Sequence, residues 1–179
     1  MQRYVAFLRA INVGGHTVKM DRLRGLFGEL GLAGVETFIA SGNVIFETAE
    51  GDLQGLERRI ERHLRQALGY EVATFIRSAS ELTAIAAHRP FPASETEGAL
   101  LYVALLPSPP DDEALRRLLA FRSEVDDFHV HGREVYWLCR KKTSESAFSG
   151  ALLERALGMP ATLRNVTTLR KLADRYGRA

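Results

Sequence analysis

The order in which strand-like and helix-like patterns alternate is the feature that most constrains the fold of this chain. In the first half, short apolar runs typical of strands alternate with segments whose apolar residues recur every three or four positions, as on an amphipathic helix. The predicted strands cover 3–9, 35–39, 44–47 and 72–77, and the predicted helices cover 20–30 and 53–68. Strand, helix, strand, strand, helix, strand is the βαββαβ order of ferredoxin-like domains.

The second half repeats this order without repeating the residues. Its predicted strands cover 99–106, 128–131, 134–139 and a short piece at 161–163, and its predicted helices cover 111–119, 148–157 and 166–176. A repeated order of elements indicates a structural duplication. We therefore expect an α+β fold of two tandem ferredoxin-like halves with an extra C-terminal helix.

A segment rich in Pro, Ser, Thr and Glu separates the two halves. A short helix over 78–88, capped by Ser78 or Ser80, is stopped by the prolines at 90 and 92. The predicted organisation is a first half at 1–89, a linker at 90–98 and a second half at 99–179.

Composition restricts the class of protein. Hydrophobic residues make up 46% of the chain and charged residues 26%, as in ordinary globular domains. No apolar run approaches the roughly 20 residues that cross a bilayer, and Arg9 interrupts the N-terminal run before it could serve as a signal peptide. We expect a cytoplasmic protein with no membrane partner.

The single cysteine, Cys139, excludes an intrachain disulfide. Its apolar neighbours favour a small buried side chain, although the basic residues at 140–142 leave a nucleophilic role open. Residues 140–179 hold nine Lys and Arg against three Asp and Glu, whereas residues 1–139 hold 15 against 19. This basic end indicates an anionic partner or, equally, a solvated face.

Two polar segments of the first half are candidates for binding. The loop at 9–15 leads from a strand into a helix and contains paired glycines, which is a common setting for anions and also for a plain tight turn. Its spacing matches neither the dinucleotide-binding fingerprint nor the P-loop. The turn at 41–43 offers small polar groups, but a hairpin connection explains it as well.

A third polar segment, 164–168, lies at the predicted start of the last helix. Arg164 suits bidentate contacts to an oxyanion, and Asn165 is either part of such a site or simply the helix N-cap. His129 and His131 share one face of a strand, but the sequence places no third ligand beside them, so we expect no metal site. No motif indicates a particular enzyme class or cofactor.

A set of motifs spread along the chain carries a resemblance to a known family. They are residues 3–15 with Met20, 41–46, 77–78 with 81–82, 90–92, 153–154, 157–158, 161–162, 164–165 and Thr168. Through them the chain is similar to the bacterial family called domain of unknown function 1697, over nearly its whole length. Departures from that pattern include Ala10, where Gly is usual, Ala147 in place of Lys, and Val166 and Thr167 in place of Trp and Asn. The resemblance implies an α+β fold with ferredoxin-like halves and implies no activity.

The leading hypothesis is a protein that binds a small phosphorylated or carboxylated ligand in a cleft between the two halves. The alternatives are a structural or oligomeric interaction module and, ranked last, nucleic-acid binding through the basic C-terminal region. The predicted ligand-binding residues are Arg9, Asn12, Gly14, Gly15, Ser41, Asn43, Arg164, Asn165 and Thr168.

Overall fold

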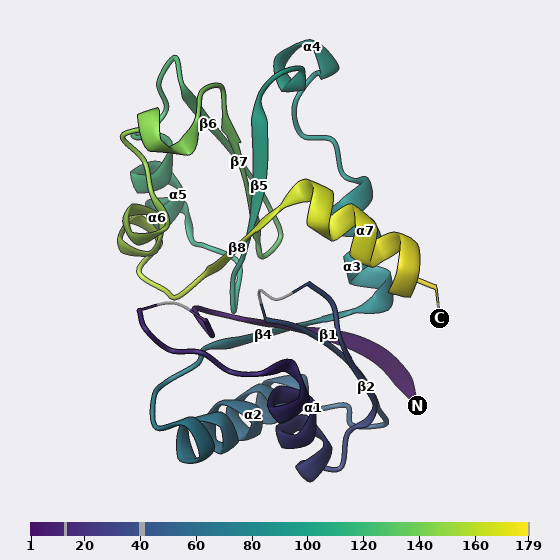
Figure 1. Cartoon of the computed structure of the whole chain (residues 1–179). Coiled ribbons are helices and arrows are strands. Elements are labelled where there is room, and N and C mark those ends of the chain that lie inside the picture. The colour runs from purple at the N-terminus through teal and green to yellow at the C-terminus, as the bar shows by residue number, and fades with distance from the viewer. Residues whose placement is uncertain (13, 40–41, 179) are drawn as a thin grey trace. The chain divides into compact units, whose positions relative to one another are not determined.

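A computed structural model describes residues 1–12, 14–39 and 42–178 of the chain (Figure 1). By their contacts, Met1–Ala84 and Lys171–Ala179 form one compact unit, and Ile85–Arg170 form another. We call these the first and second units. The ranges predicted from sequence kept the whole last helix in the second half, whereas the contacts group its C-terminal part with the first unit.

The first unit is built on a four-stranded antiparallel sheet. Its strands lie in the order β2-β3-β1-β4, and both helices cover one face of the sheet (Figure 1). The elements are β1 (Gln2–Leu8), α1 (Met20–Glu29), β2 (Ala33–Thr37), β3 (Asn43–Thr48), α2 (Leu53–Leu68) and β4 (Thr74–Ser78).

The core of the first unit follows from the two periodicities in the sequence. Alternate residues of β1, such as Tyr4 and Ala6, face the helices, where they meet Phe27 of α1 and Ile60 of α2. Helix α2 begins where Asp52 Oδ1 accepts the Gly55 N–H at 2.9 Å, and it ends at Gly69, whose φ is +84°. A residue in the left-handed backbone conformation commonly ends a helix, and glycine adopts this conformation without strain.

The second unit repeats the arrangement of the first. Its strands are antiparallel in the order β6-β7-β5-β8, and α5 and α6 pack on one face. Each strand occupies the place of its counterpart in the first sheet. Because both units combine an antiparallel sheet with helices, the α+β class predicted from sequence is confirmed. The elements are β5 (Leu100–Leu105), α5 (Asp112–Leu119), β6 (Asp126–His131), β7 (Glu134–Cys139), α6 (Gly150–Leu157) and β8 (Thr162–Asn165).

Four further helical elements supplement the two sheets within the described residues. They are α3 (Ala79–Ala87), α4 (Ala93–Thr96), one turn of 3₁₀-helix (Thr143–Glu145) and α7 (Val166–Tyr176). Ser78, one of the two predicted caps, starts α3: its Oγ accepts the Glu81 N–H, and Glu81 Oε2 accepts the Ser78 N–H. Helix α4 lies within the predicted linker.

Within the described ranges, no helix has both the length and the apolar character needed to cross a bilayer.

Candidate functional site

The loop that follows β1 is stabilised by a hydrogen bond between one of its own side chains and its backbone. Asn12 Oδ1 accepts the Val18 N–H at 2.8 Å, which fixes the path toward α1. Gly14 and Gly15 are exposed with φ of +65° and +84°. Arg9 is exposed, and Ala10 has a left-handed φ of +55° at the position where the resembled family usually has glycine.

The turn before β3 packs against this loop. Asn43 is buried and donates from Nδ2 to the Phe38 carbonyl at 3.0 Å, while the Gly42 carbonyl accepts the Leu8 N–H at 2.8 Å. A Cβ on Gly42 would lie 2.8 Å from Ile11 Cγ2, so only glycine fits there. Ser41 lies outside the described residues. Of the predicted binding segments, the described residues 9–12, 14–15 and 42–43 therefore belong to the first unit, where Gly42 meets Leu8 and Ile11.

The third predicted segment belongs to the second unit. Arg164 is buried on β8, donates to Thr162 Oγ1 at 2.7 Å and to the Leu163 carbonyl at 2.9 Å, and has its pKa lowered by burial to about 10. Thr168 is half-buried on α7 and does not line the cavity described below. Asn165 does line it. The cleft between the two halves that the sequence suggested stays a prediction.

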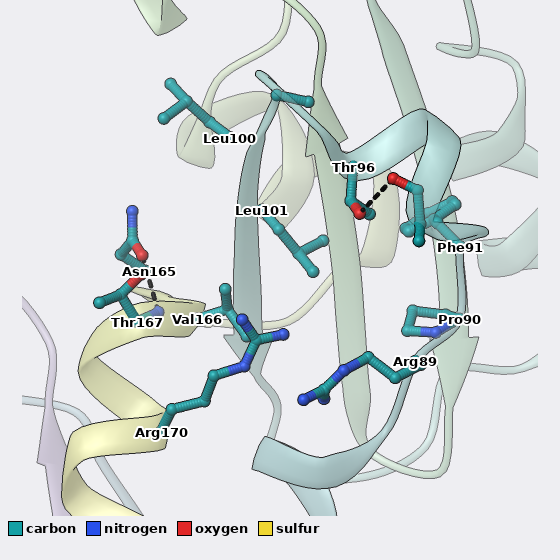
Figure 2. A pocket seen from close by; sticks show the side chains of 12 residues that line it. Arg89, Pro90, Phe91, Thr96, Leu100, Leu101, Asn165, Val166, Thr167 and Arg170 are labelled. Atoms are coloured by element: carbon teal, nitrogen blue, oxygen red, sulfur yellow. Dashed lines mark hydrogen bonds between the residues drawn. The ribbon is translucent and has the colours of Figure 1, made fainter.

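A cavity of about 560 Å³ opens in the second unit between the segment after α3, strand β5 and the start of α7 (Figure 2). One part of its wall is apolar and includes Phe91 and Leu101, and another part carries two arginines. The residues that line it are Arg89, Pro90, Phe91, Ala93, Thr96, Ala99, Leu100, Leu101, Asn165, Val166, Thr167 and Arg170.

The two arginines give the cavity its electrostatic character. Figure 2 shows Arg89 and Arg170 directed toward the same part of the cavity. Burial lowers the pKa of Arg170, and the nearby charge of Arg89 lowers it further. Arg170 Nε is buried and makes no hydrogen bond with any part of the chain that the structure describes. Arg89 Nη1 donates to the carbonyls of Ala86 and His88, at 2.8 and 3.2 Å.

The start of α7 forms the rim of the same cavity. Asn165 Oδ1 accepts the Thr167 N–H at 2.8 Å, which is the capping role that the sequence offered as the alternative to binding. Because a helix N-terminus carries partial positive charge, α7 adds to the potential of the two arginines.

Sequence reasoning missed both cavity arginines. Arg89 is predicted only to follow a helix, and Arg170 lies inside the last helix without a motif around it. The only sequence signal that pointed this way was the excess of basic residues in 140–179.

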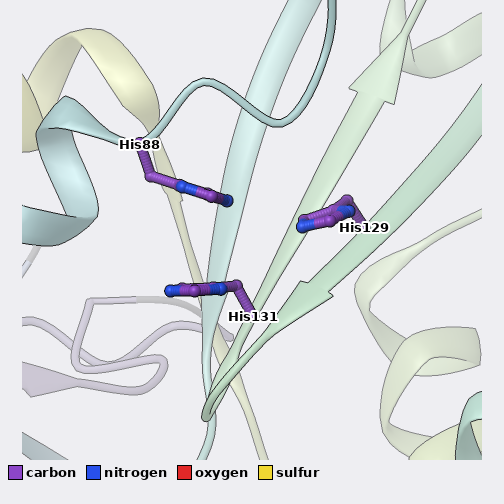
Figure 3. Close-up of side chains that lie close together, drawn as sticks. All are labelled: His88, His129 and His131. Atoms are coloured by element: carbon purple, nitrogen blue, oxygen red, sulfur yellow. The ribbon is translucent and has the colours of Figure 1, made fainter.

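Three histidines also gather in the second unit (Figure 3). His129 and His131 project from the same face of β6, and His88 approaches them from the end of α3. The His88 ring centroid lies 4.3 Å from that of His131, 5.4 Å from that of His129 and 5.0 Å from that of Tyr136. No pattern in the sequence indicates His88 as the neighbour of the β6 pair.

The environment of His88 disfavours its charged form. Burial lowers the pKa of His88, and positive charge on His131 and His129 lowers it further. Its Nε2 is buried and, among the residues that the structure describes, has no hydrogen-bond partner.

Cys139 is fully buried on β7, and its thiol donates to the Lys141 carbonyl at 3.0 Å. Burial raises the pKa of this thiol, which suppresses the reactive thiolate. The geometry thus agrees with a small buried side chain.

Comparisons with known proteins place the chain in a family. Its structure is similar to "the structure of conserved bacterial protein SP0830 from Streptococcus pneumoniae", with a TM-score of 0.77 and 22% sequence identity over 99% of both chains. At this identity the likeness shows a shared fold. No curated protein matches the chain significantly. Residues 1–136 match the family described as "Protein of unknown function (DUF1697)", and the chain belongs to this family.

Proposed function

We propose that the second-unit cavity binds a small organic anion, phosphorylated or carboxylated. The observation that carries this proposal is the pair of arginines, Arg89 and Arg170, in one cavity whose described lining residues include no carboxylate. The proposed site lies in the second unit alone, whereas the sequence predicted a cleft between the two halves.

The arrangement of the two arginines favours an oxyanion. Two guanidinium groups repel one another, and the effect grows where water is partly excluded. A buried N–H without a partner, such as Arg170 Nε, is costly in free energy. A phosphate or carboxylate would relieve the repulsion and accept the N–H, since guanidinium groups bind both anions through paired hydrogen bonds. The N-terminus of α7 would add to the attraction.

The rest of the cavity indicates that the ligand has an organic body. Phe91, Leu101 and Val166 supply apolar surface beside the charged part. The volume of about 560 Å³ lies within the range of roughly 300–1,000 Å³ that is typical of small-molecule sites. A sugar phosphate, a nucleotide or an aromatic carboxylate would suit this combination.

A thermal-shift screen of sugar phosphates, nucleotides and carboxylates tests the proposal, because a ligand of the folded state raises the melting temperature. Calorimetry on the best compound should give an affinity that Arg170→Ala weakens by about 10-fold or more, with partial recovery in Arg170→Lys. Arg155→Ala is the matched control, because Arg155 is an exposed arginine on α6 of the same unit. Equal weakening by Arg155→Ala, or no compound that raises the melting temperature, would contradict the proposal.

The basic C-terminal region keeps nucleic acid as a second candidate ligand. Binding to RNA or DNA would weaken steeply with added salt, whereas binding of a small anion in the cavity would depend less on salt. A steep salt dependence with oligonucleotides, together with no response to small anions, would favour the second candidate.

We also propose that each unit is a ferredoxin-like half and that the protein is cytoplasmic. The shared element order and the strand orders β2-β3-β1-β4 and β6-β7-β5-β8 support the first point. An experimental structure with a different strand order in either sheet would overturn the ferredoxin-like assignment. Fractionation of cells that express the chain tests the cytoplasmic location.

A further inference from the structure

We propose that His88, His129 and His131 form a binding site for a divalent transition-metal ion, best matched by zinc, with three imidazole ligands and one open coordination position. This site is separate from the anion-binding function proposed above and rests on different residues.

The first support is the distance between the ligand nitrogens. One ring nitrogen from each histidine lies within 4.8 Å of the other two. Around a tetrahedral zinc with Zn–N bonds of 2.0–2.1 Å, the nitrogens lie about 3.4 Å apart. The three rings therefore need small side-chain rotations to reach the metal geometry. His131 is exposed, so its rotation meets the least resistance.

The second support is the way in which the backbone positions the rings. Residues 129 and 131 alternate along β6 and so face the same side of the sheet, which brings two ligands together on a regular element. Tyr136, the cross-strand partner of His129, packs against the His88 ring and donates its hydroxyl to the Ile85 carbonyl at 3.1 Å. This contact holds the end of α3, and with it His88, beside the pair.

The third support is the buried Nε2 of His88. A ring nitrogen that is removed from water normally has a hydrogen-bond partner, because its desolvation is otherwise uncompensated. His88 Nε2 has none within the described residues, and its ring is next to two further imidazoles. A metal ion at the centre of the cluster would give this nitrogen a partner.

The ligand set determines the kind of metal. Neutral imidazoles suit zinc, copper, nickel and iron, whereas magnesium and calcium prefer oxygen ligands. Three protein ligands leave the fourth tetrahedral position for water or another small ligand, as in catalytic zinc sites. Glu134, the cross-strand partner of His131, adds negative charge on the same face.

Zinc titration of the full chain by calorimetry tests this proposal after metal has been removed with a chelator. We expect one Zn²⁺ per chain. Loss of an outer-shell partner of a metal ligand weakens affinity by 10–100-fold, so His131→Ala, which removes a ligand, should weaken it by at least about 100-fold. The matched control is the double variant His16→Ala/His63→Ala, since His16 and His63 are the two histidines of the first unit. The control should bind Zn²⁺ as the unchanged chain does.

Two further measurements separate metal binding from other effects. Co²⁺ bound at a tetrahedral site gives strong visible absorption, which should appear in the unchanged chain and in Arg170→Ala but not in His88→Ala or His131→Ala. Far-ultraviolet circular dichroism checks that each variant is folded, and exposed His131 is the substitution least able to disturb folding. Absence of stoichiometric Zn²⁺ binding, or equal loss in the His16→Ala/His63→Ala control, would overturn the metal site and leave the anion site unaffected.

Discussion

In the first unit, two asparagines beside β1 and β3 bond to the backbone of their own loops, whereas in the second unit polar side chains line a cavity or gather into a cluster. Asn12 and Asn43 each hold a loop in place through a backbone group. Arg170 Nε and His88 Nε2 have no such partner among the described residues. Two sheets with the same strand order thus differ in what their polar groups do.

The difference arises where segments outside the repeated elements meet the second sheet. Both sheets have two helices on one face and the same antiparallel neighbours. The cavity and the histidine cluster both depend on the end of α3, and the cavity also depends on α4 and the first turns of α7. We infer that the duplicated sheets and helices supply stability, and that the segments added to the second sheet supply candidate function.

The largest effect should come from the cores, where the units are alike. Phe46→Ala in the first unit and Trp137→Ala in the second each remove a buried aromatic side chain that faces the helices. Each should lower the free energy of unfolding by about 3–5 kcal/mol in urea denaturation. Trp137 Nε1 also donates to buried Asp126 at 2.8 Å, so the loss of unfolding free energy in Trp137→Ala should lie at the upper end of this range. A loss below about 1 kcal/mol in either variant would show that this unit is not packed as described.

Asparagine substitutions should distinguish the two units by their effects on anion affinity. Asn43→Ala removes a buried side chain and leaves the part-buried Phe38 carbonyl without its side-chain donor. It should cost about 1–3 kcal/mol of stability without changing anion affinity. Asn165→Ala removes the cap of α7, should cost about 1 kcal/mol and should also weaken anion binding. Urea denaturation and calorimetry measure both quantities. The same anion affinity in the two variants would show that Asn165 contributes no more to binding than Asn43 does.

Particular residues show how far sequence reasoning reaches. The boundaries of α2 could be predicted because its apolar spacing, Asp52 and Gly69 are all local signals. The chemical role of Asn43 could not, since its burial depends on β3 pairing with β1. His88 and Arg89 are neighbours in the chain, but each meets its partners from a distant segment: Arg89 lies beside Arg170, and His88 lies beside the histidines of β6. No local spacing in the sequence indicates either meeting.

Alkaline pH should affect the first unit through Tyr70. Burial raises the pKa of Tyr70, whose hydroxyl donates to the Ile11 carbonyl at 3.0 Å. The unfolded chain loses this proton near pH 10 while the folded chain retains it, so stability present below pH 10 is lost as the pH rises through the folded pKa.

The variant Tyr70→Phe isolates this contribution. It should cost about 1 kcal/mol at pH 8 and make the decline of stability above pH 10 shallower, as followed by urea denaturation at several pH values. Identical slopes for the two proteins would show that Tyr70 does not contribute.

The smallest effect should be a gain in stability. Ala10 has a φ of +55°, where a Cβ costs about 1–2 kcal/mol, and glycine recovers this at the expense of greater freedom in the unfolded chain. Ala10→Gly should therefore stabilise the protein by about 0.5–1 kcal/mol in thermal or urea denaturation. A destabilised variant would show that Ala10 is not strained.

We expect a small anion to bind the second unit and not the polar loops of the first. A two-dimensional ¹H–¹⁵N NMR titration of the full chain with the best ligand from the thermal-shift screen distinguishes the two locations. We expect chemical-shift changes concentrated in 89–101 and 165–170, and their loss in Arg170→Ala. Changes centred on 9–15 and 42–43, unaltered by Arg170→Ala, would contradict the account.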